Sequence, residues 1–251
     1  MPNREIRSET VLNAVRHAWS REPRLHQRTP QLHMAFADGT LTLEGEVPDI
    51  AAKKLALELA AAVPAVKGIV DRLHVAPAER LGDGEVRDLV RRALEQEPAF
   101  GELALSEIVK GEEQTVREPA GRRRGWIRLS VAEGVVTLDG EVPGLEYKRL
   151  AGVLAWWVPG SRDVINGLGV VPDEPDNDAE ITDAVRMALE KDPFVDAGQI
   201  IVGTVDAVVT LAGLVPTESE REMAEFDAWY VFGVDRVHNR IEVAASAKPR
   251  G

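Results

Sequence analysis

The sequence predicts an α+β protein of three tandem αββαβ units, each a small three-stranded sheet covered on one face by two helices. Two observations predict this class. A strand-like segment that ends in glycine, one further residue, valine and proline occurs three times, at residues 40–49, 135–144 and 208–217. Around each copy, helical and strand periodicities follow one another in the same order, as expected for an internal repeat.

Constant offsets align the three copies. Gly45, Gly140 and Gly213 are separated by 95 and 73 residues, and the same offsets relate the following valines, prolines and last strands. The first helices align instead with offsets of 75 and 95, so the middle copy carries an insertion of about 20 residues near 104–125. We therefore predict domains at residues 1–78, 79–172 and 173–251, the last with a short C-terminal tail.

Each unit is expected to begin with an amphipathic helix. A helix in the third unit is expected to be capped by Asp178 or Thr182, and a proline follows its end. In the first unit, apolar residues recur close to the helical period at Val11, Leu12, Val15, Ala18 and Trp19. This period places them on one face, which we expect to cover the sheet.

A hairpin, a second helix and a last strand complete each unit. Alternation of apolar and polar residues predicts the hairpin strands, and each repeat glycine is interpreted as a strand glycine at a bulge or close backbone approach. The proline that follows is expected in the first helical turn, where its missing N–H costs nothing. The buried face of the second helix is predicted at Leu55, Ala56, Ala60 and Val63, and at Leu150, Ala151, Ala155 and Val158.

Composition narrows the function classes. The 251 residues are 44% apolar but contain no apolar run of about 18 residues, so no transmembrane helix is predicted. The charged N-terminal sequence is not a signal peptide, and we expect a cytoplasmic protein. The absence of cysteine excludes disulfides, thiolate metal sites and cysteine nucleophiles. The net charge of −12 divides into +1, −3 and −10 over residues 1–80, 81–172 and 173–251, so nucleic acid is not an expected partner.

The repeat pattern resembles the BON domain, the bacterial OsmY and nodulation module, also called the transport-associated domain. The resemblance rests on V-T-L-x-G-x-V at residues 136–142 and 209–215, and on G-x-x-x-V-x-N-x-L/I-x-V at 160–170 and 233–243. In the first unit Asp71 stands where the others have Asn166 and Asn239. The resemblance implies the αββαβ fold and a binding function. Its members are associated with envelope integrity, osmotic shock protection and phospholipid surfaces, many of them are periplasmic, and a few cytoplasmic relatives bind potassium.

The insertion carries one candidate binding feature, the basic run Arg122, Arg123 and Arg124 followed by Trp126. A basic tip with a flanking aromatic residue is suited to lipid headgroups or another polyanion. The alternative interpretation is a solvated loop, in which nearby glutamates pair with the arginines and Trp126 is the first core residue of the next strand.

Aromatic pairs in the second helices form another candidate. Trp156 and Trp157 align with Trp229 and Tyr230, and the first unit has two alanines there. Adjacent helical residues point about 100° apart, so one ring of each pair is expected near the surface. Such rings suit packing between units, self-association or a membrane boundary. Packing between units is favoured, because acidic residues crowd the third helix.

The sequence lacks the usual motifs of enzymes and metal sites. The five histidines have no metal-ligand spacing, and no phosphate loop, dinucleotide fingerprint or nucleophile motif occurs. We therefore predict a non-enzymatic binding or scaffold protein without a cofactor or metal, with membrane phospholipid or an envelope protein as its partner. The alternatives are a cytoplasmic protein–protein or self-assembly module and a small-ion sensor of the potassium-binding type.

Overall fold

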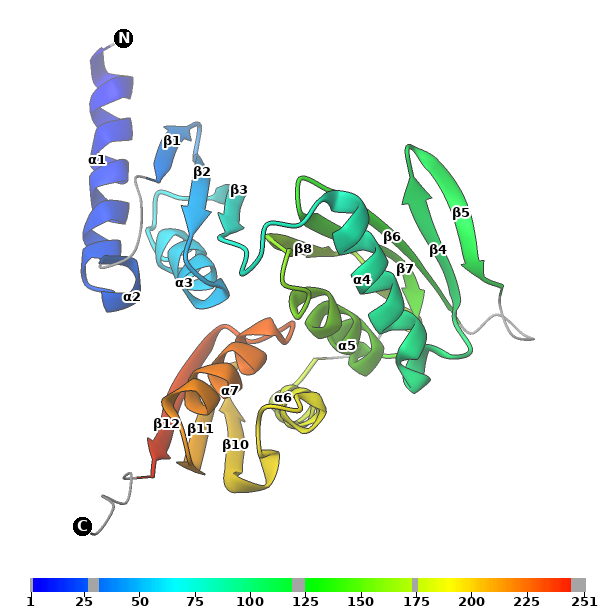
Figure 1. The fold of residues 1–251 in the computed structure, drawn as a ribbon. Helices are drawn as coiled ribbons and strands as arrows, with labels where there is room; N and C mark the ends of the chain where they lie inside the picture. Colours follow the sequence, from blue (N-terminus) through cyan, green and yellow to red (C-terminus); the bar gives the residue numbers. More distant parts are fainter. Residues whose placement is uncertain (1, 27–31, 119–124, 173–175, 245–251) are drawn as a thin grey trace. The chain divides into compact units, whose positions relative to one another are not determined.

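The computed structural model describes residues 2–26, 32–118, 125–172 and 176–244, and it confirms the α+β class with three mixed sheets (Figure 1). The chain divides into two compact units, Met1–Ala76 and Pro77–Gly251. The first repeat forms one unit alone, whereas the second and third repeats together form the other.

The first unit has the predicted αββαβ order with one additional short helix. Its central strand β2 pairs antiparallel with β1 and parallel with β3, so the second helix is the crossover between two parallel strands. The elements are α1 (Pro2–Ser20), α2 (Pro23–His26), β1 (His33–Ala37), β2 (Thr40–Val47), α3 (Ile50–Ala61) and β3 (Gly68–Val75).

The middle repeat departs from the predicted three-stranded sheet, because its insertion adds a hairpin. Strand β4 pairs parallel with β6, and the six-stranded sheet has the order β5-β4-β6-β7-β8, with β9 also paired to β7. The elements are α4 (Asp83–Gln96), the 3₁₀ turn η1 (Pro98–Phe100), β4 (Ala104–Val109), β5 (Glu112–Arg117), β6 (Trp126–Ala132), β7 (Val135–Val142), α5 (Leu145–Trp156), β8 (Asp163–Asn166) and β9 (Gly169–Val170).

The insertion therefore contains regular secondary structure, and the solvated-loop interpretation of Arg122, Arg123 and Arg124 falls outside the described residues. Residues Lys110 and Gly111 have positive φ values of 53° and 86°, the conformation of a tight two-residue hairpin turn. The turn joins β4 to β5, and Ile108 and Val109 give β4 the β-branched residues that favour a strand.

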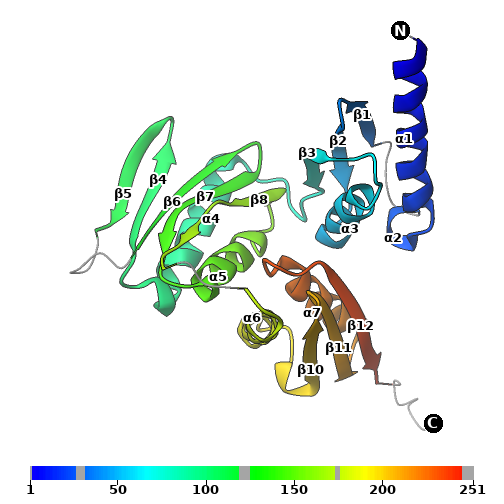
Figure 2. The ribbon, with the colours of Figure 1, turned by 180° about the vertical axis from the view of Figure 1, so that it is seen from behind.

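The third repeat keeps the basic pattern. Strand β11 is central, antiparallel to β10 and parallel to β12. The elements are α6 (Asp178–Lys191), the 3₁₀ turn η2 (Ala197–Gln199), β10 (Ile200–Val205), β11 (Val208–Val215), α7 (Glu218–Tyr230) and β12 (Arg236–Val243). Figures 1 and 2 show α6 and α7 on one side of this sheet.

The cores lie between each sheet and its helices. The face predicted for the second helices is confirmed, with one difference: Val63 is only partly buried. The buried members are Leu55, Ala56, Ala60, Leu150, Ala151, Ala155 and Val158. Alternate strand residues complete each core, such as Leu41 and Leu43 in the first unit.

Two details of the helix starts differ from the predictions. Asn177, not Asp178 or Thr182, caps α6, since its Oδ1 accepts the N–H groups of the two residues that follow Asp178. The Asp178 carboxylate instead accepts hydrogen bonds at 2.8 and 2.9 Å from the N–H groups of Asp206 and Ala207 in the hairpin turn. The repeat prolines precede the N-cap residue rather than lying inside the first turn, so α3 begins two residues after Pro48.

The repeat glycines lie where a neighbouring strand comes close. A Cβ atom on Gly140 would lie 2.0 Å from the carbonyl oxygen of Trp126, and one on Gly213 would lie 2.0 Å from that of Gln199. On Gly45, the nearest atom would be Cδ2 of the Leu32 side chain, at 2.7 Å. Glycine is therefore needed at this repeat position because the neighbouring chain leaves no room for a side chain. No bound ligand is required to explain it.

Candidate functional site

The free face of the third sheet, opposite α6 and α7, carries exposed apolar side chains. Ile201, Val205 and Leu214 are 73%, 69% and 52% exposed. They lie on one face, because Ile201 pairs with Ala212, two residues before Leu214, and the side chains alternate along each strand. We call these three residues the apolar stripe. Exposed apolar area of this kind marks interaction surfaces more often than isolated residues do.

A row of basic residues borders the apolar stripe on the same face. On β12, Val237 and Ile241 are buried, so the alternate residues Arg236, His238 and Arg240 lie on the free face. Parallel pairing places Arg240 beside Ala212. We call these three residues the basic row. It is followed by an exposed acid, Glu242.

Most acidic residues of the third repeat lie on the opposite side, in the helical layer. This layer is responsible for much of the net charge of −10 of residues 173–251. Its acids include Asp178, Glu180, Asp183, Glu190, Glu218, Glu220, Glu222 and Glu225. The sheet thus separates an acidic helical layer from a face whose charges are mostly basic.

The free face of the first sheet is different. Thr42, Glu44 and Arg72 lie there, and Arg72 forms an exposed ion pair with Glu44 at 3.8 Å. Val70 is its most exposed large apolar residue, at 40%. This face is polar and has no counterpart of the apolar stripe.

Trp126, the aromatic residue predicted beside the basic run, lies on the free face of the middle sheet. The prediction that it is a core residue is wrong, because the next residue, Ile127, faces the helices and is buried. The guanidinium carbon of Arg128 lies 5.5 Å from the Trp126 ring centroid. Arg128 also pairs with Asp139 at 3.4 Å and with Glu113 at 3.9 Å, so its charge is balanced locally.

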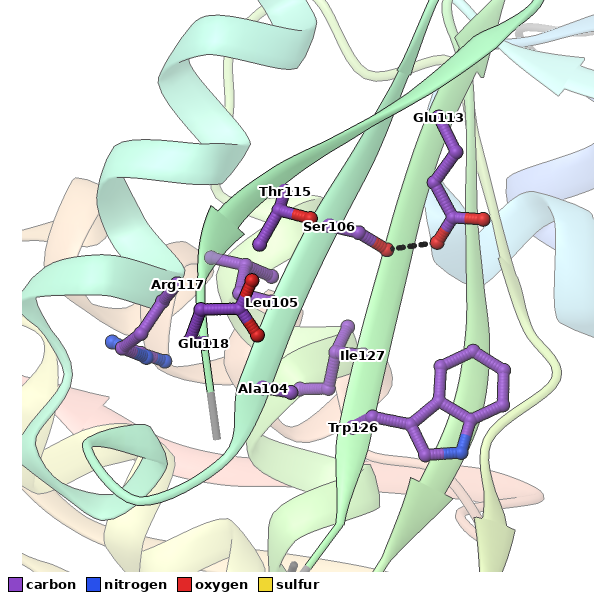
Figure 3. Close-up of a pocket in the computed structure, with 9 residues that line it drawn as sticks. All are labelled: Ala104, Leu105, Ser106, Glu113, Thr115, Arg117, Glu118, Trp126 and Ile127. Carbon is purple, nitrogen blue, oxygen red and sulfur yellow. Dashed lines mark hydrogen bonds between the residues drawn. The ribbon is translucent and has the colours of Figure 1, made fainter. Parts of the chain in front are cut away.

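A groove of about 310 Å³ runs along the inserted hairpin beside Trp126 (Figure 3). Three of its polar side chains are engaged within the protein: Ser106 Oγ donates to Glu113 at 2.6 Å, and Arg117 donates to the carbonyl oxygens of Leu103 and Phe100. Arg122, Arg123 and Arg124 lie outside the described residues, so their role in binding stays a prediction.

The predicted aromatic pairs lie mainly between the second and third repeats. The rings of Trp156 and Tyr230 stack with centroids 5.6 Å apart and planes 14° apart. The Trp157 indole N–H donates to Oδ1 of Asp227 at 2.8 Å. Trp229 is the exception, because its side chain is 1% exposed and is part of the buried core. Binding of a ligand or partner by these residues stays a prediction.

A buried arginine joins the same two repeats. Arg149 of α5 is 2% exposed, and its guanidinium pairs with Asp176 and, at 3.7 Å, with Glu180 of α6. Its Nε also donates to the Phe232 carbonyl oxygen at 3.0 Å. The neighbouring Lys148 ammonium lies 4.5 Å from the Phe232 ring centroid, and burial lowers the pKa of Lys148. Sequence reasoning did not single out Arg149.

Sequence reasoning also missed a buried acid at this interface. Asp227 is 2% exposed, and it stands where the repeat offsets place Leu59 and Leu154 in the other copies. Burial raises the pKa of Asp227 to about 8, the Trp157 hydrogen bond opposes this rise, and the Asp192 carboxylate adds to it. An acid at a leucine position of the repeat is the signal that identifies it.

Within residues 2–26, 32–118, 125–172 and 176–244, no group of three or more histidine, aspartate or glutamate side chains is placed to hold a metal ion. No helix in the same described segments combines the length and apolar character needed to span a membrane.

A family model described as the BON domain matches residues 14–77, 118–172 and 177–245, which confirms the three predicted copies. Two solved structures of CdsD, a structural protein of the type III secretion system of Chlamydia trachomatis, are each 15% identical. The first, the C-terminal domain, covers 94% of this chain and 98% of its own, with a TM-score of 0.25. The second covers 94% and 92%, with a TM-score of 0.24. At these TM-scores, the two structures support no conclusion about this chain.

Proposed function

Because the chain belongs to the BON domain family, of which it contains three tandem copies, we propose that it is a non-enzymatic binding protein that attaches to a phospholipid surface of the cell envelope. The observation that supports this proposal is the free face of the third sheet, where the apolar stripe lies beside the basic row. Peripheral membrane attachment combines apolar side chains at the headgroup boundary with cations that meet anionic lipids.

Charge separation makes this attachment compatible with the acidic composition. The net charge of −12 would repel an anionic surface if it were spread evenly. The acids of the third repeat lie largely on α6 and α7, and the free face carries Arg236 and Arg240 against one acid, Glu242. Salt screens charges over about 8–10 Å at ordinary concentrations. Charges on the free face therefore affect the attraction to a lipid surface more than charges on the helical layer behind the sheet.

Vesicle co-sedimentation tests the proposal. The full chain is mixed with vesicles of phosphatidylglycerol and phosphatidylcholine, or of phosphatidylcholine alone, at low and moderate salt. Binding is expected on the anionic vesicles and should weaken with salt. Absence of binding to either vesicle at low salt would contradict the proposed function.

The surface is tested by a triple variant of the apolar stripe, Ile201→Ser, Val205→Ser and Leu214→Ser. Loss of three aliphatic contacts should weaken vesicle binding by about tenfold or more, since each buried methylene contributes about 0.8 kcal/mol. The matched control replaces three exposed apolar residues outside the stripe, Val70, Ile165 and Phe194, with serine. Equal loss in both triple variants would show that attachment does not depend on this face.

The basic run tests the other predicted contact. Replacing Arg122, Arg123 and Arg124 with serine removes three cations that can approach anionic headgroups, each worth about 1 kcal/mol near such a surface. If the run contributes, vesicle binding weakens and its salt dependence decreases. Unchanged binding would leave the third sheet as the contact surface.

A protein partner on the same face is the second candidate. The other face of this sheet is covered by the amphipathic helices α6 and α7, so an apolar helix or sheet face of a partner or a second copy fits the apolar stripe in the same way. Light scattering of the full chain at high concentration tests self-association. Dimers that dissociate in the stripe variant, together with no binding to vesicles, would favour this candidate.

A further inference from the structure

Three helices from two repeats meet at one buried acid. Asp227 lies on α7, Asp192 ends α6, and Trp157 ends α5 of the second repeat. Asp227 Oδ1 accepts the Trp157 indole hydrogen bond at 2.8 Å. Its Oδ2 is buried and has no hydrogen-bond partner in the described part of the chain. A buried carboxylate oxygen without a donor is costly, so the group should carry a proton.

The neighbouring acid explains where that proton points. If both carboxyl groups are ionised, neither can donate a hydrogen bond to the other. A protonated Asp227 has an O–H that can donate to Asp192. Asp192 is the acceptor in this pair, and its Oδ1 also accepts the Phe194 N–H at 2.8 Å. The Asp227 carboxyl group accepts only the hydrogen bond from the Trp157 indole among the described residues. One proton shared by the pair therefore satisfies the atom that is otherwise unpartnered.

The described charged groups on the surrounding elements do not neutralise Asp227. On α6, Lys191 pairs with Glu97 at 2.8 Å, and on α5, Arg149 pairs with Asp176 and Glu180. On α7 itself, the Glu220 carboxylate accepts the Asp196 N–H, and Glu225 accepts from Asn239. Strand β11 has no charged residue, and the charged residues of β12 alternate onto the opposite face of the sheet: Arg236, His238, Arg240 and Glu242.

We propose that Asp227, Asp192 and Trp157 form a proton-dependent clamp between the second and third repeats, closed while the two carboxyl groups share a proton and loosened when it leaves. An ionised Asp227 beside Asp192 needs water. The Trp157 side chain, which comes from the other repeat, lies against it, so hydration requires the α5–α7 contact to open. This inference is independent of what the third sheet binds.

The direction of the pH dependence follows from the pKa of Asp227, which burial raises from its ordinary value of 3.8 to about 8. The folded, clamped form holds the proton more tightly than the unfolded chain. The stabilisation is therefore fully present below pH 3.8 and is lost as the pH rises through about 8. The clamp is tightest in mild acid and weakest in mild alkali.

Nuclear magnetic resonance of the indole N–H groups in the full chain tests the clamp directly. The Trp157 signal, assigned with Trp157→Phe, should titrate with a midpoint of about 8, because its acceptor changes charge. In Asp227→Asn this signal should stay constant over the same range. A Trp157 signal that does not change between mildly acidic and alkaline pH would overturn the proposal.

Thermal unfolding gives a second readout. Between about pH 6 and pH 9, we expect the transition of the unit that contains the second and third repeats to fall by at least about 4 °C, and to fall much less in Asp227→Asn. The control is Asp183→Asn, an exposed acid of α6 that is 76% accessible and pairs with Arg186, and it should keep the native pH dependence. The same pH dependence in Asp227→Asn as in the native chain would count against the clamp.

A second variant keeps the test available if Asp227→Asn does not fold. In Asp192→Asn the like charge is removed, so the midpoint of the Trp157 signal should move to lower pH while the titration itself persists. An unchanged midpoint would show that Asp192 is not part of the clamp.

Discussion

The first repeat and the pair formed by the second and third repeats share one fold but differ at the end of the second helix. The first repeat has Ala61 and Ala62 there, and both are exposed. The other two have tryptophan or tyrosine, and Trp156 stacks on Tyr230 across the boundary between repeats. The first repeat forms a compact unit alone, whereas the other two form one together. We infer that these aromatic residues, which the first repeat lacks, contribute to holding the second and third repeats in one unit.

Buried charge differs between the same regions. In the first repeat, Lys53 is buried and pairs within its own repeat with Asp71 at 3.1 Å. In the second, the buried cation Arg149 pairs with acids of the third. A cation of similar burial thus stabilises a single repeat in one region and joins two repeats in the other.

The largest effect is expected for Arg149→Ala. Removing a buried guanidinium leaves Asp176 and Glu180 without their partner and the Phe232 carbonyl oxygen without its donor, which costs about 3–5 kcal/mol. Urea denaturation should show this loss in the unit that contains the second and third repeats and leave the first unit unchanged. The matched control is Lys54→Ala at the equivalent position of the first repeat, expected to cost about 1 kcal/mol or less. Equal costs at both positions would contradict the comparison.

Glycine substitution should give the next largest effect and again separate the regions. In Gly140→Ala, the new Cβ would meet a backbone carbonyl oxygen at 2.0 Å, and φ is +141°. Both problems destabilise the middle repeat, by about 3 kcal/mol. In Gly45→Ala, φ of +142° strains the new residue as at Gly140, but the steric clash is with the movable end of the Leu32 side chain rather than with backbone, so the cost should be about 1–2 kcal/mol. Differential scanning calorimetry of each variant measures the two costs, and a larger cost at Gly45 would refute this account.

Loss of the aromatic stack should have a moderate effect. Trp156→Ala removes the ring that faces Tyr230 and should destabilise the unit of the second and third repeats by about 2 kcal/mol, from lost burial and lost stacking. The control, Trp156→Phe, keeps an aromatic ring and should cost less than half as much. Unfolding of the full chain by urea, followed by near-ultraviolet circular dichroism, distinguishes the two. A native-like Trp156→Ala would mean that the stack does not hold the repeats together.

Much of the fold is predictable from local sequence patterns. The structure differs from the prediction where contacts between residues far apart in the sequence determine the conformation. Offsets between the glycines predict three copies, and helical periodicity predicts the buried face that includes Ala60 and Ala155, because each repeat builds its own core. The hairpin β4–β5 was missed, although Lys110 and Gly111 form a tight turn, since the other copies offer no counterpart for comparison.

The candidate site was less predictable for the same reason. Trp126 is different, because alternation along β6 already separates Ile127, Leu129 and Val131 from Trp126, Arg128 and Ser130, so the strand pattern was sufficient to place Trp126 on the free face. Asp227 resembles the other helical acids in sequence, and only its packing under Trp157 and beside Asp192 changes its chemistry. The apolar stripe is hidden in sequence, since Ile201 follows a buried isoleucine in a strand of ordinary composition.

The smallest effect is expected where the first repeat departs from the family pattern, at Asp71. In the other repeats, an asparagine amide donates to a helix carbonyl oxygen: Asn166 to Lys148 at 2.7 Å and Asn239 to Arg221 at 2.9 Å. Asp71 has no such donor when ionised, and the side chain of Lys53, at the position equivalent to Lys148, turns inward instead. Its ammonium donates to the Leu73 carbonyl oxygen at 2.7 Å and pairs with Asp71.

Asp71→Asn should therefore remove one carboxylate from beside a buried ammonium while restoring the amide donor. The two changes oppose each other, and we expect a loss of about 1 kcal/mol in the first unit only. Adding Lys53→Met to Asp71→Asn removes the buried charge, so the double variant should recover to within about 0.5 kcal/mol of the native chain. Urea denaturation of the single and double variants measures this coupling. A double variant less stable than Asp71→Asn alone would show that Lys53 stabilises the first repeat through contacts other than its pairing with Asp71.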